Sequence, residues 1–293
     1  MKVGICLPYA EKELDRQCLI DWCRAVDQGP FSSLSCGERI IGASRDMRVV
    51  LAAAAALTER VRIVPSLYVL PMHDAVRAAK EIATLDILSG GRVTLTVGVG
   101  GREDDYRAVG ASFAGRHPRM DEQIATLRRV WNGEPGFEGA PEVGPLPVQA
   151  GGPPIWTGAM GPLAMARAAR WADGIYAWSG NGQQAEMEAS LGRARAAWQK
   201  ADRPTPPQPI GGFWFSLAKN SETRLREYVF DYLRVFGEDA ARAMAAPMNR
   251  NTPDAVADGL DQMEAAGCEE VFLVPATADI DEVERAAEVV ARR

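Results

Sequence analysis

The stretch 83–110, ATLDILSGGRVTLTVGVGGREDDYRAVG, contains one complete unit of the fold. It predicts the end of a helix, a glycine stop at 89–91, and a continuous apolar strand over 92–98. Three glycines (Gly98, Gly100 and Gly101) and the acidic run 103–105 follow the strand. A strand that is apolar at successive positions is typical of a parallel sheet covered on both faces.

The same strand-then-helix unit recurs along the whole chain. Strands are predicted at 2–7, 32–36, 61–67, 92–98, 154–158, 173–178, 210–218 and 269–275, each followed by helical periodicity. Eight such units close most simply into a (β/α)8 TIM barrel, here one domain over 1–293, and a doubly wound open sheet is the competing architecture. The loop at 133–154, rich in proline and glycine, is expected to be a surface insertion.

Composition excludes several classes of function. The 33 basic and 39 acidic residues give a net charge of −6, and no basic stripe is present, so we expect no nucleic-acid partner. No apolar run is long enough to span a bilayer, and the first residues do not resemble a secretory signal. Five cysteines without paired spacing indicate reduced thiols in a cytoplasmic protein. With only two histidines, we also expect no metal site.

In a barrel of this kind, function lies at the carboxyl ends of the strands. Gly98 to Gly101 lie at one such end, but the dinucleotide fingerprint fails because its last glycine position holds Glu103. Each glycine alone is best explained by a turn. Three at one strand end favour close approach of the backbone to a ligand.

A second strand end carries the sequence WTGAMGP, from Trp156 to Pro162. Small residues lead into a helix with proline in its first turn, so free amides within 157–161 suit a phosphate. An ordinary strand-to-helix turn explains the same residues equally well. Asp104 and Asp105 are interpreted as negative charges at the start of a short helix.

Two segments, KEIATLDILSGGRVTLTVGVGGREDDYRAVG and PPIWTGAMGPLAMARAARWADGIY, resemble the bacterial luciferase-like monooxygenase family. The resemblance runs from the first strand to the last helix and is strongest over 72–132 and 153–178. It implies a TIM barrel, with 133–154 as a shortened form of the family's insertion. It also implies an oxidoreductase that uses FMN or the deazaflavin coenzyme F420.

The resemblance also implies a set of cofactor-binding positions. Ser66-Leu67 matches the place where deazaflavin-using members hold a cis peptide behind the cofactor ring. Gly98, Val99, Gly100 and Gly101 match the segment beside the ring, and the amides of Gly158 and Ala159, between Thr157 and Met160, match those that hold the phosphate. A further strand end near the cofactor is matched by Trp178, Ser179 and Gly180.

The second strand departs from the family pattern. Many members end it in a carboxylate and a histidine that acts as acid or base, whereas this chain has Glu38 and Arg39. Arginine cannot exchange protons near neutral pH. The catalytic candidates are therefore Glu38, Arg39 and Glu103, with the histidine's role passing to one of the two glutamates or to none. Asp74 stands where another family histidine is frequent.

The resulting hypothesis is hydride transfer between F420, or FMN, and a small organic substrate. One alternative is an FMN-dependent monooxygenase that activates oxygen. Two others are a flavin-binding barrel without catalysis and a flavin-free lyase or isomerase acting on a phosphorylated substrate. Family members are often dimers, so a homodimer is a candidate assembly, although the sequence shows no exposed apolar stripe.

Overall fold

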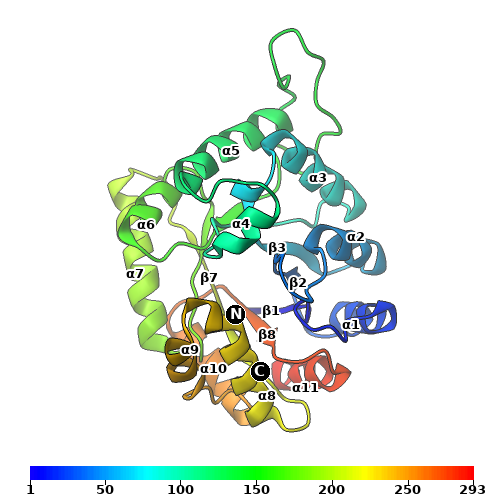
Figure 1. Cartoon of the computed structure of the whole chain (residues 1–293), viewed down its shortest axis with the longest axis vertical. Helices are drawn as coiled ribbons and strands as arrows, with labels where there is room; N and C mark the ends of the chain where they lie inside the picture. The colour runs from blue at the N-terminus through cyan, green and yellow to red at the C-terminus, as the bar shows by residue number, and fades with distance from the viewer.

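The computed structural model describes residues 1–293 and contains a closed barrel of eight parallel strands. Neighbouring strands pair in sequence order, and β8 pairs with β1 to close the barrel (Figure 1). The strands are β1 (Lys2–Cys6), β2 (Ser33–Cys36), β3 (Arg62–Tyr68), β4 (Leu95–Val97), β5 (Ile155–Thr157), β6 (Gly174–Tyr176), β7 (Gln208–Phe215) and β8 (Glu270–Pro275). The predicted TIM barrel is confirmed, because a doubly wound sheet would leave two open edges.

Helices form the outer ring of the barrel. They are α1 (Arg16–Gln28), α2 (Met47–Leu57), α3 (Ala75–Leu88), α4 (Glu103–Ala108), α5 (Arg116–Trp131), α6 (Pro162–Ala168), α7 (Gln184–Lys200), α8 (Ser221–Leu233), α9 (Glu238–Ala245), α10 (Pro253–Ala265) and α11 (Ile280–Ala291). Short 3-10 turns stand at η1 (Leu70–Met72) and η2 (Arg234–Phe236). None of these helices is both long and apolar enough to cross a membrane.

Two helix boundaries differ from simple periodicity for local reasons. The helical pattern of 72–88 begins only at Ala75, because the Asp74 carboxylate caps α3 by accepting the Arg77 amide at 2.9 Å. The segment between α8 and α9 breaks at Gly237, whose φ of 116° lies outside helical space. Asp74 is exposed and serves as this helix cap in the place of the family's frequent histidine.

The barrel interior is layered. At the amino ends of the strands, buried Glu270 accepts the Ser32 and Ser33 hydroxyls at 2.7 and 2.6 Å and pairs with Arg62. Above that pair lies an apolar layer made by Val64, Trp156, Ile210 and Phe272. Side chains therefore fill the interior at the amino ends of the strands, and a ligand site can form only at their carboxyl ends.

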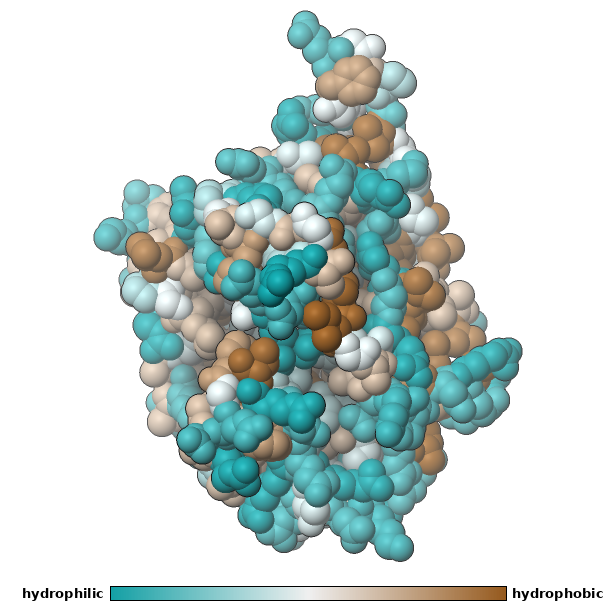
Figure 2. Space-filling model, in the orientation of Figure 1, coloured by the Kyte–Doolittle hydropathy of each residue, from teal (hydrophilic) through white to brown (hydrophobic).

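Figure 1 is viewed toward the carboxyl ends of the strands, because α4, α8 and α9, which follow β4 and β7, lie in front of the barrel. Apolar side chains gather around a shaded hollow near the centre of this face (Figure 2). The loop 133–154 projects away at the top of Figure 1, as expected for a surface insertion. It is tied to α3 by Lys80, whose Nζ donates to the Gly144 carbonyl at 2.5 Å.

Candidate active site

The ends of β3, β4 and β5 meet around the side chain of Leu67. A Cβ added at Gly98 would lie 2.7 Å from Leu67 Cδ1, and one added at Gly158 would lie 3.3 Å from both of its methyl groups. The Ser66-Leu67 peptide is cis, as the family resemblance implied. A side chain at either rim would therefore press on the half-buried Leu67, which fills the space between them.

The segment after β4 turns at Gly100. Its φ of 62° is left-handed, and a Cβ there would lie 2.8 Å from Val69. Tyr106 on α4 fixes the turn by donating its hydroxyl to the Val99 carbonyl at 2.5 Å. At Gly101 an added Cβ would meet Phe236 at 3.4 Å, so this rim touches the segment between α8 and α9.

The end of β5 supplies free amides, but not the one expected at Gly158. The Gly158 amide donates to the Val97 carbonyl at 3.2 Å, and the Thr157 hydroxyl donates to the same oxygen at 3.1 Å. The next three amides, from Ala159 to Gly161, make no hydrogen bond within the chain. The candidate anion site therefore consists of the amides of Ala159 to Gly161 and excludes that of Gly158. Gly158 contributes instead by having no side chain, which leaves space for Leu67.

The end of β6 holds one residue that is already engaged. Ser179 is 1% exposed, donates to Glu186 at 2.6 Å and accepts the Gln183 amide at 2.9 Å. It shapes the turn into α7, so its hydroxyl does not face a ligand. Trp178 is half-buried against Trp214, with ring centroids 4.6 Å apart, and Gly180 lies under Met248.

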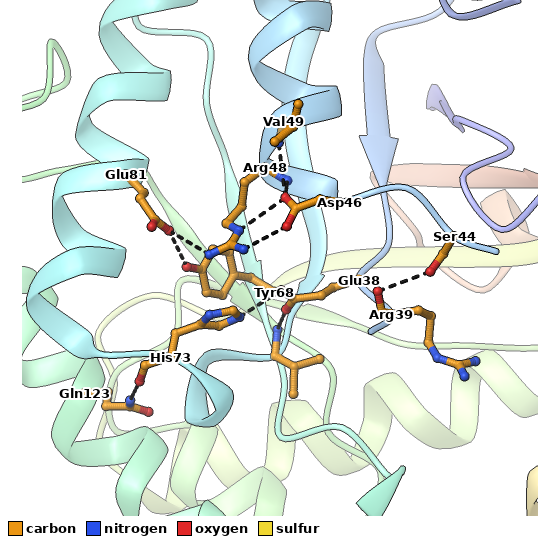
Figure 3. Close-up of polar contacts among 11 residues, drawn as sticks. Glu38, Arg39, Ser44, Asp46, Arg48, Val49, Tyr68, His73, Glu81 and Gln123 are labelled. Carbon is orange, nitrogen blue, oxygen red and sulfur yellow. Dashed lines mark hydrogen bonds and ion pairs between the residues drawn. The ribbon is translucent and has the colours of Figure 1, made fainter. Parts of the chain in front are cut away.

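Glu38, at the end of β2, is a buried anchor. Its side chain is 4% exposed; one oxygen lies 2.8 Å from His73 Nε2 and the other accepts the Val69 amide at 2.7 Å (Figure 3). Gln123 on α5 in turn donates to the His73 carbonyl at 2.7 Å (Figure 3). Both carboxylate oxygens are occupied, so Glu38 ties β2 to the segment after β3.

Arg39 and Glu103 do not join Glu38. Arg39 Nε donates to Asp105 at 3.1 Å, and the second oxygen of Asp105 accepts the Ile41 amide at 2.8 Å. Asp105 lies in the first turn of α4, as expected, and is only 6% exposed, so its carboxylate is also engaged in these two structural contacts. Glu103 is exposed in the first turn of α4. The three catalytic candidates thus occupy separate environments, two of them in structural contacts.

A family model described as luciferase-like monooxygenase matches residues 1–290. The chain belongs to the luciferase-like monooxygenase family. Among its relatives, the F420-dependent hydroxymycolic acid dehydrogenase of Mycobacterium tuberculosis is 32% identical over 186 residues, 61% of this chain and 46% of that protein. The chain spans about half the length of the curated relatives it matches, with 56% of the relative covered in one such alignment.

Solved structures share the luciferase-like fold over nearly the full chain. Monooxygenase RslO1 from Streptomyces bottropensis has a TM-score of 0.78 at 21% identity, covering 100% of this chain and 98% of that one. The oxygenating constituent of 3,6-diketocamphane monooxygenase of Pseudomonas putida, in complex with FMN, has a TM-score of 0.73 at 17% identity and covers 100% and 98%. These likenesses establish the fold.

Several residues at the mouth of this luciferase-like barrel were missed by sequence reasoning. His73 and Asp105 partner the predicted Glu38 and Arg39, but no spacing rule joins residues so far apart in the chain. Four tyrosines also reach the mouth: Tyr9, Tyr176, Tyr228 and Tyr232. They come from the segment after β1, from β6 and from α8, and the only signal for them was the position of Tyr9 and Tyr176 near strand ends.

Proposed function

We propose that this protein is an oxidoreductase that transfers a hydride between coenzyme F420, or FMN, and a small organic substrate at the barrel mouth. The observation that carries the proposal is the row of unpartnered amides from Ala159 to Gly161, beside the close packing of Gly98 and Gly158 against Leu67. Membership of the luciferase-like monooxygenase family supports the same reading.

The residues present fit such a cofactor. Free N–H groups at the end of a parallel strand can donate hydrogen bonds to the oxygens of a phosphate without a lysine. Val99 and Gly100 present a main chain held by Tyr106, and Trp178 offers an aromatic face on the far rim. When bound, F420 supplies hydride transfer, and reduced FMN supplies either hydride transfer or oxygen activation. The chain's residues then bind, orient and exclude water.

An FMN-dependent monooxygenase is the second candidate. The similarity of the fold to two monooxygenases, one of them in complex with FMN, favours it, whereas the F420-dependent dehydrogenase among the relatives favours the first. Because cofactor identity decides the class of reaction, measuring which cofactor the protein binds distinguishes the two candidate functions.

The deciding experiment is titration of the purified protein with F420 and with FMN, followed by cofactor fluorescence. We expect saturable binding in the nanomolar-to-micromolar range for one and weaker binding for the other. Binding without turnover of any substrate class would point to a non-catalytic barrel. Binding of sugar phosphates but of neither cofactor would instead indicate a flavin-free lyase or isomerase and contradict the proposal.

We also propose a homodimer formed through α2. The alanine-rich stretch of α2 turns Ala54 and Ala55 inward and leaves Ala52, Ala53 and Ala56 on the outer side. Val49 is 70% exposed at one end of this face, and Leu88 on neighbouring α3 is 52% exposed. A groove of about 610 Å³ lies between the two helices. A contiguous apolar face of this kind marks an interaction surface.

Sedimentation of the wild type and of Val49→Glu tests the dimer. We expect a dimer in the first and a monomer in the second, with Met244→Glu, a 53% exposed position on α9, as the matched control that stays dimeric. A wild-type monomer at micromolar concentration would contradict the proposed dimer.

The five cysteines are free thiols, which supports a reducing, cytoplasmic setting.

A further inference from the structure

Five of the six tyrosines of the chain fall into two groups by what their hydroxyls contact. Tyr68 donates to Glu81 at 3.0 Å and Tyr106 to the Val99 carbonyl at 2.5 Å, both within the chain. The hydroxyls of Tyr9, Tyr228 and Tyr232 have no such partner and are not sealed in the interior. Three phenol hydroxyls without a partner in the chain are therefore available to bond a ligand at one site.

These three side chains converge on the barrel mouth. Tyr228 and Tyr232 lie one turn apart on α8 and stack, with ring centroids 6.2 Å apart and planes within 17°. Burial raises the pKa of Tyr9, and the nearby Tyr232 and Tyr228 raise it further. The fourth tyrosine, Tyr176, lies against the Ser66 hydroxyl. The cluster thus faces the rim where Ser66 and Leu67 lie.

The backbone makes room for two members of the cluster. A Cβ at Gly37 would lie 2.5 Å from the Tyr9 hydroxyl oxygen, and one at Gly212 would lie 2.6 Å from that of Tyr176. Tyr9 is only 7% exposed. These positions are fixed by packing, so the phenols are preorganised.

The phenol groups of this wall are uncharged. Burial raises the pKa of both Tyr9 and Tyr228 well above the ordinary value, so their hydroxyls stay protonated near neutral pH. Arg39, which approaches Tyr228, is paired with Asp105. Arg102 stacks over the Tyr232 ring at 4.9 Å and donates to the Tyr232 carbonyl. Glu11 is an acidic neighbour of Tyr228, and the cationic side chains of Arg224 and Lys12 lie near Glu11.

We propose that Tyr9, Tyr228 and Tyr232 are specificity-determining residues that select an organic substrate bearing a carbonyl or hydroxyl oxygen. This inference rests on the proposed function and names the substrate class of the same mouth. A phenol O–H donates well to a neutral oxygen, and the neighbouring Trp178 and Trp214 rings offer an apolar surface to the remainder of the ligand.

The test uses two uncharged probes that differ in one group: 4-(dimethylamino)benzaldehyde and N,N-dimethyl-p-toluidine, which has a methyl in place of the aldehyde. Dissociation constants come from quenching of tryptophan fluorescence, since Trp178 and Trp214 border the cluster. The aldehyde's absorption band also shifts to longer wavelength when its oxygen accepts a hydrogen bond. We expect the wild type to prefer the aldehyde.

The variants Tyr9→Phe, Tyr228→Phe and Tyr232→Phe remove one hydroxyl each and keep the ring. Each should lower the preference for the aldehyde by roughly two- to tenfold, the worth of one net hydrogen bond. Affinity for the toluidine should not change. Tyr68→Phe is the matched control, because its hydroxyl is bonded to Glu81 outside the mouth, and it should keep the wild-type preference.

Two results would overturn the inference: a preference that all three variants retain, or no binding of either probe at millimolar concentration. Cofactor titration of the wild type and variants separates this outcome from failure of the proposed function. If neither F420 nor FMN binds while the aldehyde preference depends on the tyrosines, the proposed function fails and the tyrosine wall stands. If a cofactor binds and the aldehyde preference is absent, the proposed function stands and the inferred role of the tyrosines fails.

Discussion

Glu38 Oε1 lies 2.8 Å from His73 Nε2, and this contact joins the end of β2 to the turn that precedes α3 (Figure 3). The same carboxylate accepts the Val69 amide two residues after the cis peptide Ser66-Leu67. Glu38 therefore holds the β3 rim in place, and we assign it a positioning role.

Replacing Glu38 tests that role. Glu38→Ala leaves a buried amide at Val69 and the His73 ring without a partner, so we expect a loss of about 1–3 kcal/mol in the free energy of unfolding. Glu103→Ala, at an exposed position, should change stability by less than about 0.5 kcal/mol. Urea denaturation measures both. Equal stability of the two variants would contradict the role of Glu38 in stabilising the β3 rim.

Gly158→Val tests the contact between the β5 rim and Leu67. The new side chain would press on Leu67, and the backbone cannot retreat because the Gly158 amide is bonded to Val97. We expect cofactor affinity to fall by about tenfold or more, equivalent to ~1.4 kcal/mol. Gly192→Ala, on an open face of α7, should leave affinity unchanged and add about 0.5–1 kcal/mol of stability. Wild-type affinity in Gly158→Val would show that this rim does not touch the cofactor.

Arg102 joins the β4 rim to η2 across the mouth. Its guanidinium lies 4.9 Å from the Tyr232 ring centroid and 5.5 Å from that of Phe236, and it donates to the Tyr232 carbonyl. Arg102→Ala should speed hydrogen exchange in 232–237 and lower stability by roughly 0.5–2 kcal/mol. Arg102→Lys should restore little, because an ammonium lacks the planar stacking surface.

The matched control for Arg102 is Arg107→Ala, whose side chain is 76% exposed on α4. Exchange of 232–237 in that variant should match the wild type. If Arg102→Ala also exchanges at the wild-type rate, the β4 rim does not hold the segment between α8 and α9, and closure of the mouth depends on other contacts.

Glu282 predicts a dependence of stability on pH. It is fully buried, accepts the Ser216 hydroxyl at 2.6 Å and the Thr277 hydroxyl at 3.2 Å, and burial raises its pKa above the ordinary value of 4.5. Between pH 4.5 and this raised pKa, the folded protein keeps the Glu282 proton that the unfolded chain has already released. The stabilising contribution is complete below pH 4.5 and is lost as the pH rises through the raised pKa.

Denaturation at a series of pH values, comparing wild type with Glu282→Gln, measures this effect. The wild type should lose stability relative to the variant as the pH rises above 4.5 toward neutrality. Exposed Glu284→Gln should follow the wild-type curve. Parallel curves for wild type and Glu282→Gln would contradict the assignment of the proton to Glu282.

The sequence was sufficient for the fold because its signals are local and repeated. Most strands are continuous apolar runs and most helices have a one-sided period, although β2 (SLSC) gives a weaker signal, so eight units and their order followed from neighbouring residues. The glycine stop after α3 and the turn at Gly100 were readable for the same reason, since left-handed backbone favours glycine. The rims of the site followed from the fold, because strand ends define them.

Only the tertiary structure decided what the side chains at those rims do. Glu38 and His73 are 35 positions apart, and Arg39 and Asp105 are 66 apart, so no periodicity predicts either pair. The use of the Gly158 amide by Val97, and the gathering of tyrosines from the segment after β1, from β6 and from α8, likewise depend on closure of the barrel. Sequence sets backbone conformation through neighbours, whereas a site is made by residues that closure brings within hydrogen-bonding distance.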